Sequence, residues 1–461
     1  MLNEKQAPNL RENKMGVMPV GKLLFNMALP MIIAMVVQAL YNVVDSLFVS
    51  WYSEDGVAAL ALAFPVQNIL IGFATGIGVG VNSLLSKSLG ENNQKAANRA
   101  AGNGIFLVLI ATALFMLFGV FGSRPFFSIQ SDNAATVELG TKYITICCVG
   151  SLGIFVEVLG ERLLQSSGRT FYTLITQGTG AIVNIILDPI LIWGVPALGI
   201  PQMGIAGAAV ATVIGQWLAA ILAIIFNLKC NPEVQFSLKA IAPKKSAVIP
   251  ILTVGIPSII MVGIGSIMNF SMNQLLQGMD PTETAVKVFG IYFKLQSFFF
   301  MPLFGLNNAT ISIVAYNYGA RNPKRITGTL LRACISALCV MTAGLLIFQI
   351  FPDQLLGIFN LSDDFLVKGR SALQTISLCF PAAAFGIALS ASFQALGNGI
   401  YSTIVSLCRQ MLVLLPAAFL LSLTGNVNNV WWAFPIAECV SLMVTALLFA
   451  NIYRKKIKPM L

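Results

Sequence analysis

Two acidic residues, Asp45 and Asp188, lie inside long apolar stretches of this chain. A charge at the centre of a membrane-spanning helix costs about 2.5–3.5 kcal/mol of insertion free energy, so each such residue is expected to have a structural or functional role. Asn184 precedes Asp188 by four residues, which places both side chains on one face of a helix. Two carboxylates at similar depth, with an amide oxygen beside them, can bind H⁺ or Na⁺, and we expect a cation-coupling site here.

Further polar or small residues follow the same two helix faces at helical spacing. We take four of them as candidate neighbours of the cation: Gln38, Tyr41, Asn42 and Gly180. Two alternatives remain open. Asp188 followed by Pro189 is also typical of a helix N-cap and first turn, which would make the pair a helix boundary. Asp45 could instead form a structural hydrogen bond between helices.

Other charges also fall in apolar segments. Glu157 and Glu161 are four residues apart, with Arg162 beside them, and a structural salt bridge or an extension of the side chains towards the membrane interface is the favoured interpretation. Three more lie in the second half of the chain: Lys294, Arg409 and Glu438. There we expect a charge pair inside the bundle. The alternative is a role in the substrate cavity or in coupling for five of these charges: Glu157, Glu161, Lys294, Arg409 and Glu438.

The elements that position these residues must be membrane helices. The chain has 461 residues, 57% hydrophobic and 10% charged, whereas soluble globular domains carry about 25% charged residues. Apolar segments of about 20 residues span a bilayer, and no alternating strand pattern is present. The sequence predicts an all-α polytopic membrane protein with twelve transmembrane helices: 24–50, 57–86, 101–123, 141–165, 171–194, 204–228, 247–277, 286–317, 329–351, 371–396, 400–424 and 430–453.

Composition also narrows the function. The chain has no His, and its eight Cys match no zinc or redox spacing, so we expect no metal, no cofactor and no enzymatic activity. The net charge of +10 is concentrated in alternate loops, as in the linker residues Lys229, Lys239, Lys244 and Lys245. By the positive-inside rule both termini are cytoplasmic, and nucleic acid is not an expected partner.

The two halves of the chain resemble each other at a nearly constant offset. Gly90 and Gly319 are 229 residues apart, and Pro30 and Pro257 are 227 apart. We therefore predict a six-helix lobe at 1–228, a cytoplasmic linker at 229–246 and a second six-helix lobe at 247–461. Six helices per lobe give both lobes the same orientation around a central cleft, which is a transporter architecture. The run GFATGIGVGVNSLL (72–85) favours close helix packing.

The repeat also shows an asymmetry. The position matching Asp45 is Met272, and the position matching Asp188 is Ala417. The acid pair therefore exists only in the first half. If the pair were needed to hold a bundle together, the second bundle should have something like it, so the asymmetry favours a functional role.

Several motifs together resemble the multidrug and toxic-compound extrusion (MATE) family, in particular its bacterial branch of MepA- and DinF-like pumps. They cover nearly the whole chain: YNVVDSLFVS, SLLSKSLGENN with its counterpart SIVAYNYGARN, LQSSGRTFYTLITQGTGAIVNIILDPILI, GIYFKLQSFFFMPLFGL and VWWAFPIAE. The resemblance implies a secondary antiporter with two six-helix lobes, which exchanges amphipathic, often cationic, organic compounds for H⁺ or Na⁺.

By motif, the resemblance assigns the cation site to Asp45, Asn184 and Asp188, and it implies helix bending near Pro30. In the other branch of the family, acids occur in the seventh and tenth helices. Segments 247–277 and 371–396 contain no acid, which argues against a cation site in the second lobe.

We therefore expect a monomeric multidrug efflux antiporter in the cell membrane, with a role in xenobiotic transport and antibiotic resistance. Its partners are drug-like small molecules and the lipid bilayer. The alternative is a flippase of lipid-linked oligosaccharides or related lipids, which Lys294 and Arg409 keep open. A cavity dominated by positive charge would favour the flippase, and an acidic or neutral cavity would favour drug efflux.

Overall fold

A computed structural model describes residues 13–280, 284–357, 359 and 363–461, so the first twelve residues of the predicted N-terminal lobe lie outside it. The described residues form helices, with one isolated bridge between Val195 and Ile200. Ten helices are long and apolar enough to cross a membrane, or up to twelve if each of two bent pairs is one span. This confirms the predicted all-α polytopic fold.

The first half of the chain contains α1 (Lys14–Val17), α2 (Val20–Tyr52), α3 (Glu54–Gly90), α4 (Gln94–Leu117), α5 (Ser123–Gln130), α6 (Ala134–Val149), α7 (Leu152–Ser166), α8 (Thr170–Trp193) and α9 (Ile205–Cys230). A π-helical stretch, Phe118–Gly122, joins α4 to α5. The short helix α10 (Leu238–Ile241) lies in the predicted linker.

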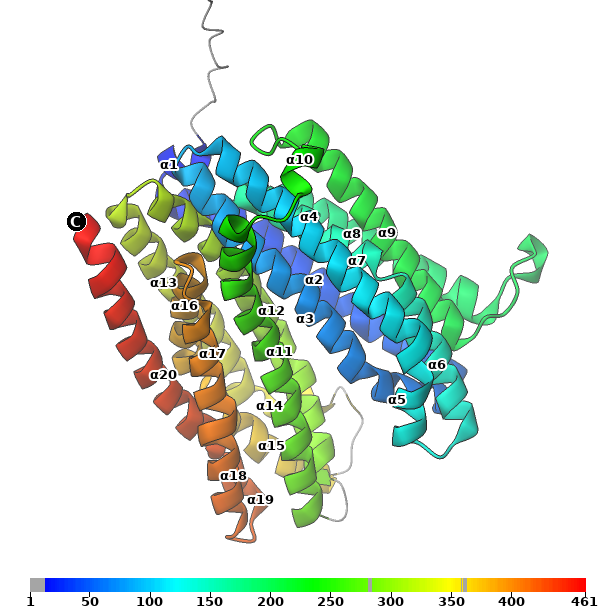
Figure 1. Ribbon diagram of the computed structural model, residues 1–461. Helices are drawn as coiled ribbons and strands as arrows, with labels where there is room; N and C mark the ends of the chain where they lie inside the picture. The colour runs from blue at the N-terminus through cyan, green and yellow to red at the C-terminus, as the bar shows by residue number, and fades with distance from the viewer. Residues whose placement is uncertain (1–12, 281–283, 358, 360–362) are drawn as a thin grey trace, which may run out of the picture.

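The second half contains α11 (Lys245–Met279), α12 (Thr284–Gly319), α13 (Pro323–Ile350), α14 (Pro352–Gly357), α15 (Asp363–Ser377), α16 (Phe380–Ala395), α17 (Gly399–Leu407), α18 (Leu415–Ser422), α19 (Val427–Val430) and α20 (Ala433–Ile452). A π-helical stretch, Cys408–Leu414, joins α17 to α18. Figure 1 shows the halves as two groups of helices, with α1 and the C-terminus on the same side of the molecule, here called the termini side.

Backbone geometry repeats between the halves. The only non-glycine residues with positive φ among those described are Asn92 (54°) and Arg321 (50°), which are 229 residues apart. Gly168 (81°) and Gly397 (74°) have the same separation. The two bent pairs, α6 with α7 and α15 with α16, both bend by 45°. The offset found in the sequence therefore corresponds to the same sequence of turns and breaks in each lobe.

The lobes contact each other closely on the termini side, and Figure 1 shows their helices diverging towards the other side. Helix α3 packs against α11 and α12. A Cβ atom at Gly80 would lie 2.2 Å from the carbonyl oxygen of Ile251, and one at Gly76 would lie 2.7 Å from that of Gly255. Only glycine permits this backbone approach, which confirms the close packing expected of the Gly-rich run.

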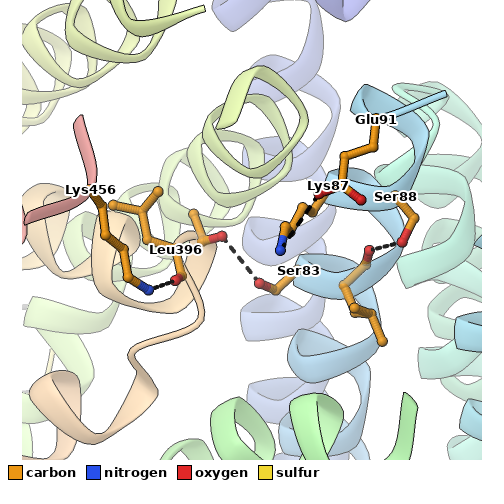
Figure 2. A network of polar contacts seen from close by, with 8 residues as sticks. Ser83, Lys87, Ser88, Glu91, Leu396 and Lys456 are labelled. Carbon is orange, nitrogen blue, oxygen red and sulfur yellow. Dashed lines mark hydrogen bonds and ion pairs between the residues drawn. The ribbon is translucent and has the colours of Figure 1, made fainter. Parts of the chain in front are cut away.

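Hydrogen bonds reinforce this contact. The Ser83 hydroxyl of α3 donates across the lobes to the carbonyl oxygen of Gln394 at 2.8 Å (Figure 2). Within the second lobe, the Lys456 ammonium donates to the carbonyl oxygen of Leu396, the C-cap of α16, at 2.6 Å. Nearby, the buried Asn82 Oδ1 accepts hydrogen bonds from hydroxyl groups of α3, α7 and α12. The Ser83 and Ser312 hydroxyls thus form hydrogen bonds between the two lobes on the termini side.

Three predictions about local structure need correction. The segment predicted as one helix at 371–396 is two helices, because α15 ends at Ser377 and α16 begins at Phe380. The interpretation of Asp188–Pro189 as a helix boundary is wrong, because α8 continues from Thr170 to Trp193. The segment predicted as one helix at 141–165 is two helices, α6 and α7. A side chain at Gly150, where α6 ends, would collide with Val213 of α9, since its Cβ would lie 2.5 Å from that side chain. Pro30 lies inside α2, which is continuous from Val20 to Tyr52.

Candidate cation site and cavities of the two lobes

The predicted cation residues come from two neighbouring helices, α2 and α8, which pack together. Asp188 is completely buried and Asn184 is 3% exposed. The Asn184 amide donates to Asp188 Oδ1 at 3.2 Å and to the Thr212 hydroxyl of α9 at 3.3 Å. Asp45 lies on α2, the helix that packs against α8. The structure therefore brings Asn184 and Asp188 into contact and places Asp45 on the neighbouring helix.

Three oxygen atoms at this site have no hydrogen-bond partner although they are buried: Asp45 Oδ1, Asn184 Oδ1 and Asp188 Oδ2. A buried polar atom without a partner is costly, and such atoms need an explanation. Oxygen ligands from carboxylates and an amide suit a hard cation, and a carboxylate suits a proton. The arrangement has the donors for either coupling ion, but among the described residues no group of three His, Cys, Asp or Glu could hold a metal ion.

A close approach of α8 and α9 positions Asn184. A Cβ atom at Gly180 would lie 3.1 Å from the carbonyl oxygen of Gly215, so the glycines let the two backbones meet one turn before Asn184. Of the predicted neighbours, Gln38, Tyr41 and Gly180 line a cavity in the first lobe that also includes Asn184 and Thr212. The fourth, Asn42, is exposed and does not line this cavity.

The same cavity, here called the N-lobe cavity, is lined by Glu157, Glu161 and Arg162, while Asp45 and Asp188 are not among its lining residues. Glu161 is buried and accepts hydrogen bonds from the Thr176 hydroxyl at 2.8 Å and the Gln177 amide at 2.9 Å. Arg162 donates to Gln165 instead, at 2.9 Å. These acids face a cavity, not the membrane interface that the sequence suggested. The cavity contains more acidic than basic side chains.

The second lobe has its own cavity, here called the C-lobe cavity, and Arg409 and Glu438 line it. Arg409 Nη1 lies 3.6 Å from Glu438 Oε1, so the expected charge pair is present. Lys294 is exposed and does not line this cavity. The C-lobe cavity is therefore mainly apolar, with one charge pair and no excess of either charge.

Sequence reasoning missed Thr212, which bonds Asn184, and Gln177, which bonds Glu161. A signal for the first was available. Thr212 and Gln216 are four residues apart on the otherwise apolar helix α9, and both line the N-lobe cavity. Their spacing is the same as that of Asn184 and Asp188, which the sequence analysis did use.

Comparisons with known proteins agree with this architecture. A family model, MatE, matches residues 30–190 and 257–420. The chain is 26% identical to an FAD transporter of Shewanella oneidensis, over 91% of this chain and 92% of the relative. It is 23% identical to the multidrug export protein MepA of Staphylococcus haemolyticus, over 91% of each chain.

Solved structures show the same fold. A crystal structure of MATE in complex with MaL6 matches with a TM-score of 0.90 and 26% identity, over 98% of this chain and 99% of that one. An outward-facing conformation of a multidrug resistance MATE family transporter of the MOP superfamily matches with a TM-score of 0.89 and 26% identity, over 97% and 98% of the two chains.

Proposed function

Because this chain belongs to the MatE family of membrane transporters, we propose that it is a secondary active antiporter that exports amphipathic, often cationic, organic compounds in exchange for H⁺ or Na⁺. The observation that carries the proposal is the group of three buried oxygens without partners, on Asp45, Asn184 and Asp188. A bound cation supplies the kind of partner that these buried oxygens lack.

The transport cycle follows from two lobes that close on alternate sides. With the termini side closed, Asp45 and Asp188 take up a cation from the other side, which removes the repulsion between the carboxylates and changes how α2 packs on α8. The substrate is released to that side. Closing the other side releases the cation and restores substrate affinity. The coupling works only if each ligand prefers a different state. A membrane potential of 100 mV adds about 2.3 kcal/mol per charge moved.

The charges of the cavities support an exporter of cations or neutral compounds. The N-lobe cavity has Glu157 and Glu161 against Arg162, and the C-lobe cavity has one balanced pair. Neither is dominated by positive charge, so a flippase of lipid-linked oligosaccharides is not favoured. The relatives are called an FAD transporter and multidrug export proteins at similar identity, so a relative's substrate does not by itself identify the substrate here.

We further propose that the termini side is cytoplasmic, in a bacterial cell membrane. The Lys-rich linker lies between α9 and α11, whose flanking ends are on this side (Figure 1). Labelling of a cysteine introduced at Lys239, with a reagent that does not cross membranes, tests the orientation. The label should react in inverted vesicles and not in intact cells, in a chain from which the native cysteines have been removed.

The function is tested by efflux of ethidium from proteoliposomes under an imposed pH gradient and then under an imposed Na⁺ gradient. One gradient should drive efflux. Asp45→Asn and Asp188→Asn should each abolish the dependence on that gradient, because an amide cannot bind a proton and binds Na⁺ weakly. Asp132→Asn, at an exposed aspartate, is the matched control. Ion-driven efflux that is undiminished in both site variants would disprove the assignment.

A further inference from the structure

The C-lobe cavity contains features that the proposed coupling mechanism does not use. Arg409 lies in the π-helical stretch Cys408–Leu414, while the equivalent part of the first lobe, around Gly180, is regular α-helix. Such π-helical insertions are rare and often occur at functional sites. The insertion shifts the following residues around the helix axis, and it does so where a charged side chain enters the cavity. The two lobes have thus diverged at the same place in the repeat.

The Arg409 guanidinium group has N–H donors that no described residue uses. Its described partner is Glu438, with Nη1 and Oε1 3.6 Å apart, and it donates no hydrogen bond to any other described residue. A guanidinium group has five N–H donors in a planar fork that fits a carboxylate. The Arg409 side chain is 27% exposed and that of Glu438 is 9% exposed, so both groups are accessible mainly from the cavity.

The remaining wall of the C-lobe cavity is aromatic and flexible. Five aromatic side chains line it: Tyr292, Phe293, Phe300, Phe304 and Phe434. Met261, Met268 and Met301 also line it, and methionine adapts its shape to different ligands. The amide oxygen of Asn307, another lining residue, is buried without a hydrogen-bond partner. A flat ring with an N–H group fits this wall.

The charge pair decides which ligands fit best. A ligand with a single positive or negative charge would bind one member of the pair and be repelled by the other, which leaves a net charge in a poorly solvated cavity. A ligand that carries an ammonium and a carboxylate on neighbouring atoms would bind both members and leave the cavity neutral. The 3.6 Å separation of the pair matches such close charges and not charges at opposite ends of a long molecule.

We propose that the C-lobe cavity is a separate substrate site for compounds with the chemistry of an aromatic amino acid, in which Arg409 binds the carboxylate, Glu438 binds the ammonium group and the aromatic wall holds the ring. This inference rests on the proposed export function for its direction of transport, but the binding site itself does not depend on the coupling residues of the first lobe.

The test is binding of tritiated L-tryptophan to the purified full chain in nanodiscs, measured by scintillation proximity. L-tryptophan should bind about ten-fold or more tightly than tryptamine, which lacks the carboxylate, and than N-acetyltryptophan, which lacks the ammonium charge. L-alanine, which lacks the ring, should compete poorly. If tryptamine competes as well as tryptophan in the unmodified chain, the proposal is overturned, and this comparison does not depend on any variant folding.

Variants then locate the site. Arg409→Gln should weaken tryptophan binding about ten-fold or more and strengthen tryptamine binding, because it removes the charge that repels the ammonium group. Glu438→Gln should likewise weaken tryptophan binding and strengthen the binding of N-acetyltryptophan, whose carboxylate Glu438 repels. Lys294→Gln removes an exposed charge from the same lobe and is the matched control. Equal losses for all ligands in Arg409→Gln would contradict the proposed contacts. Ion-driven ethidium efflux in the same preparations reports the proposed function separately, so either proposal can fail alone.

Discussion

The substitution Gly90→Ala is predicted to open the termini side. Gly90 ends α3, and a Cβ atom there would lie 1.9 Å from the carbonyl oxygen of Tyr316 in α12. The equivalent residue in the second lobe, Gly319, would place its Cβ 2.1 Å from the carbonyl oxygen of Lys87. Both obstacles are backbone atoms, which cannot rotate away as a side chain can. The two lobes therefore meet through a pair of glycines related by the internal repeat.

The size of the effect follows from this geometry. Ordinary contacts of a Cβ atom begin near 3.4 Å, so α3 and α12 would have to separate by about 1.5 Å at this point. Overpacking of this kind costs about 1–3 kcal/mol. Each 1.4 kcal/mol is about a tenfold change in an equilibrium, so the closed termini side should lose about five-fold to 150-fold in population relative to states in which the lobes are apart.

The assay is a distance measurement between spin labels on cysteines at Lys95 and Lys324, in a chain without its native cysteines. Both residues are exposed on the termini side, one in each lobe. Gly90→Ala should move the distribution to longer distances. Gly290→Ala in α12, where no atom lies within 4 Å of the added Cβ, is the matched control and should change nothing. An unchanged distribution in Gly90→Ala would refute the argument that this backbone contact closes the termini side.

Three other predictions concern the same side of the molecule. Asn82→Ala removes an acceptor shared by three hydroxyl groups, each of which keeps a carbonyl oxygen within reach, so it should cost about 1 kcal/mol and lower the unfolding temperature measured by tryptophan fluorescence. Arg325→Gln removes hydrogen bonds of 2.9 Å to the carbonyl oxygen of Met15, in α1, and 2.8 Å to that of Met18, directly after it, so trypsin should cleave faster after Lys14. Burial raises the pKa of Glu233 above its usual 4.5, although Arg169 opposes this. The folded chain then binds more protons than the unfolded one, so this group's stabilising contribution falls as pH rises above about 4.5, and Glu233→Gln should flatten that dependence in thermal unfolding.

Each of these has a distinct negative result. For Asn82→Ala, the control is Ser46→Ala, because the Ser46 hydroxyl bonds only within α2, and equal effects of the two would contradict the proposed network. For Arg325→Gln, an unchanged cleavage rate would show that other contacts hold α1. For Glu233→Gln, a slope of unfolding temperature against pH that matches the unmodified chain would mean that another group titrates.

The sequence predicted the fold for physical reasons that are local. An apolar segment long enough to cross a bilayer must be helical there, whichever helices surround it. The offset of 229 residues between Gly90 and Gly319, repeated at other positions, indicated two similar halves. The breaks within the bent pairs were not predicted. The break between α6 and α7 falls at Gly150 and Ser151, inside a segment that is otherwise apolar and long enough to read as one span. A side chain at Gly150 would collide with Val213, which comes from another helix.

The parts of the site that depend on residue spacing within one helix could be predicted from the sequence. The four-residue spacing of Asn184 and Asp188 and the cost of a charge inside a span were enough to name the acids, as was the absence of their counterparts in the second half. The cation assignment itself stays a prediction. The rotation of each helix about its axis determines which oxygens lack partners, and it leaves Asn42 exposed and outside the N-lobe cavity. The sequence of one segment does not fix this rotation.

By itself, therefore, the sequence determined an all-α membrane chain with two related lobes and a set of buried charges, because those properties follow from the cost of placing polar groups in hydrocarbon. Only the tertiary structure decided the partners of those charges. It placed Glu161 beside Thr176 and Gln177 instead of Arg162, and it paired Arg409 with Glu438 while leaving Lys294 exposed. The reason is that the partners lie on different helices or turns. The distances between them depend on helix packing and rotation, which residue spacing along the chain does not determine.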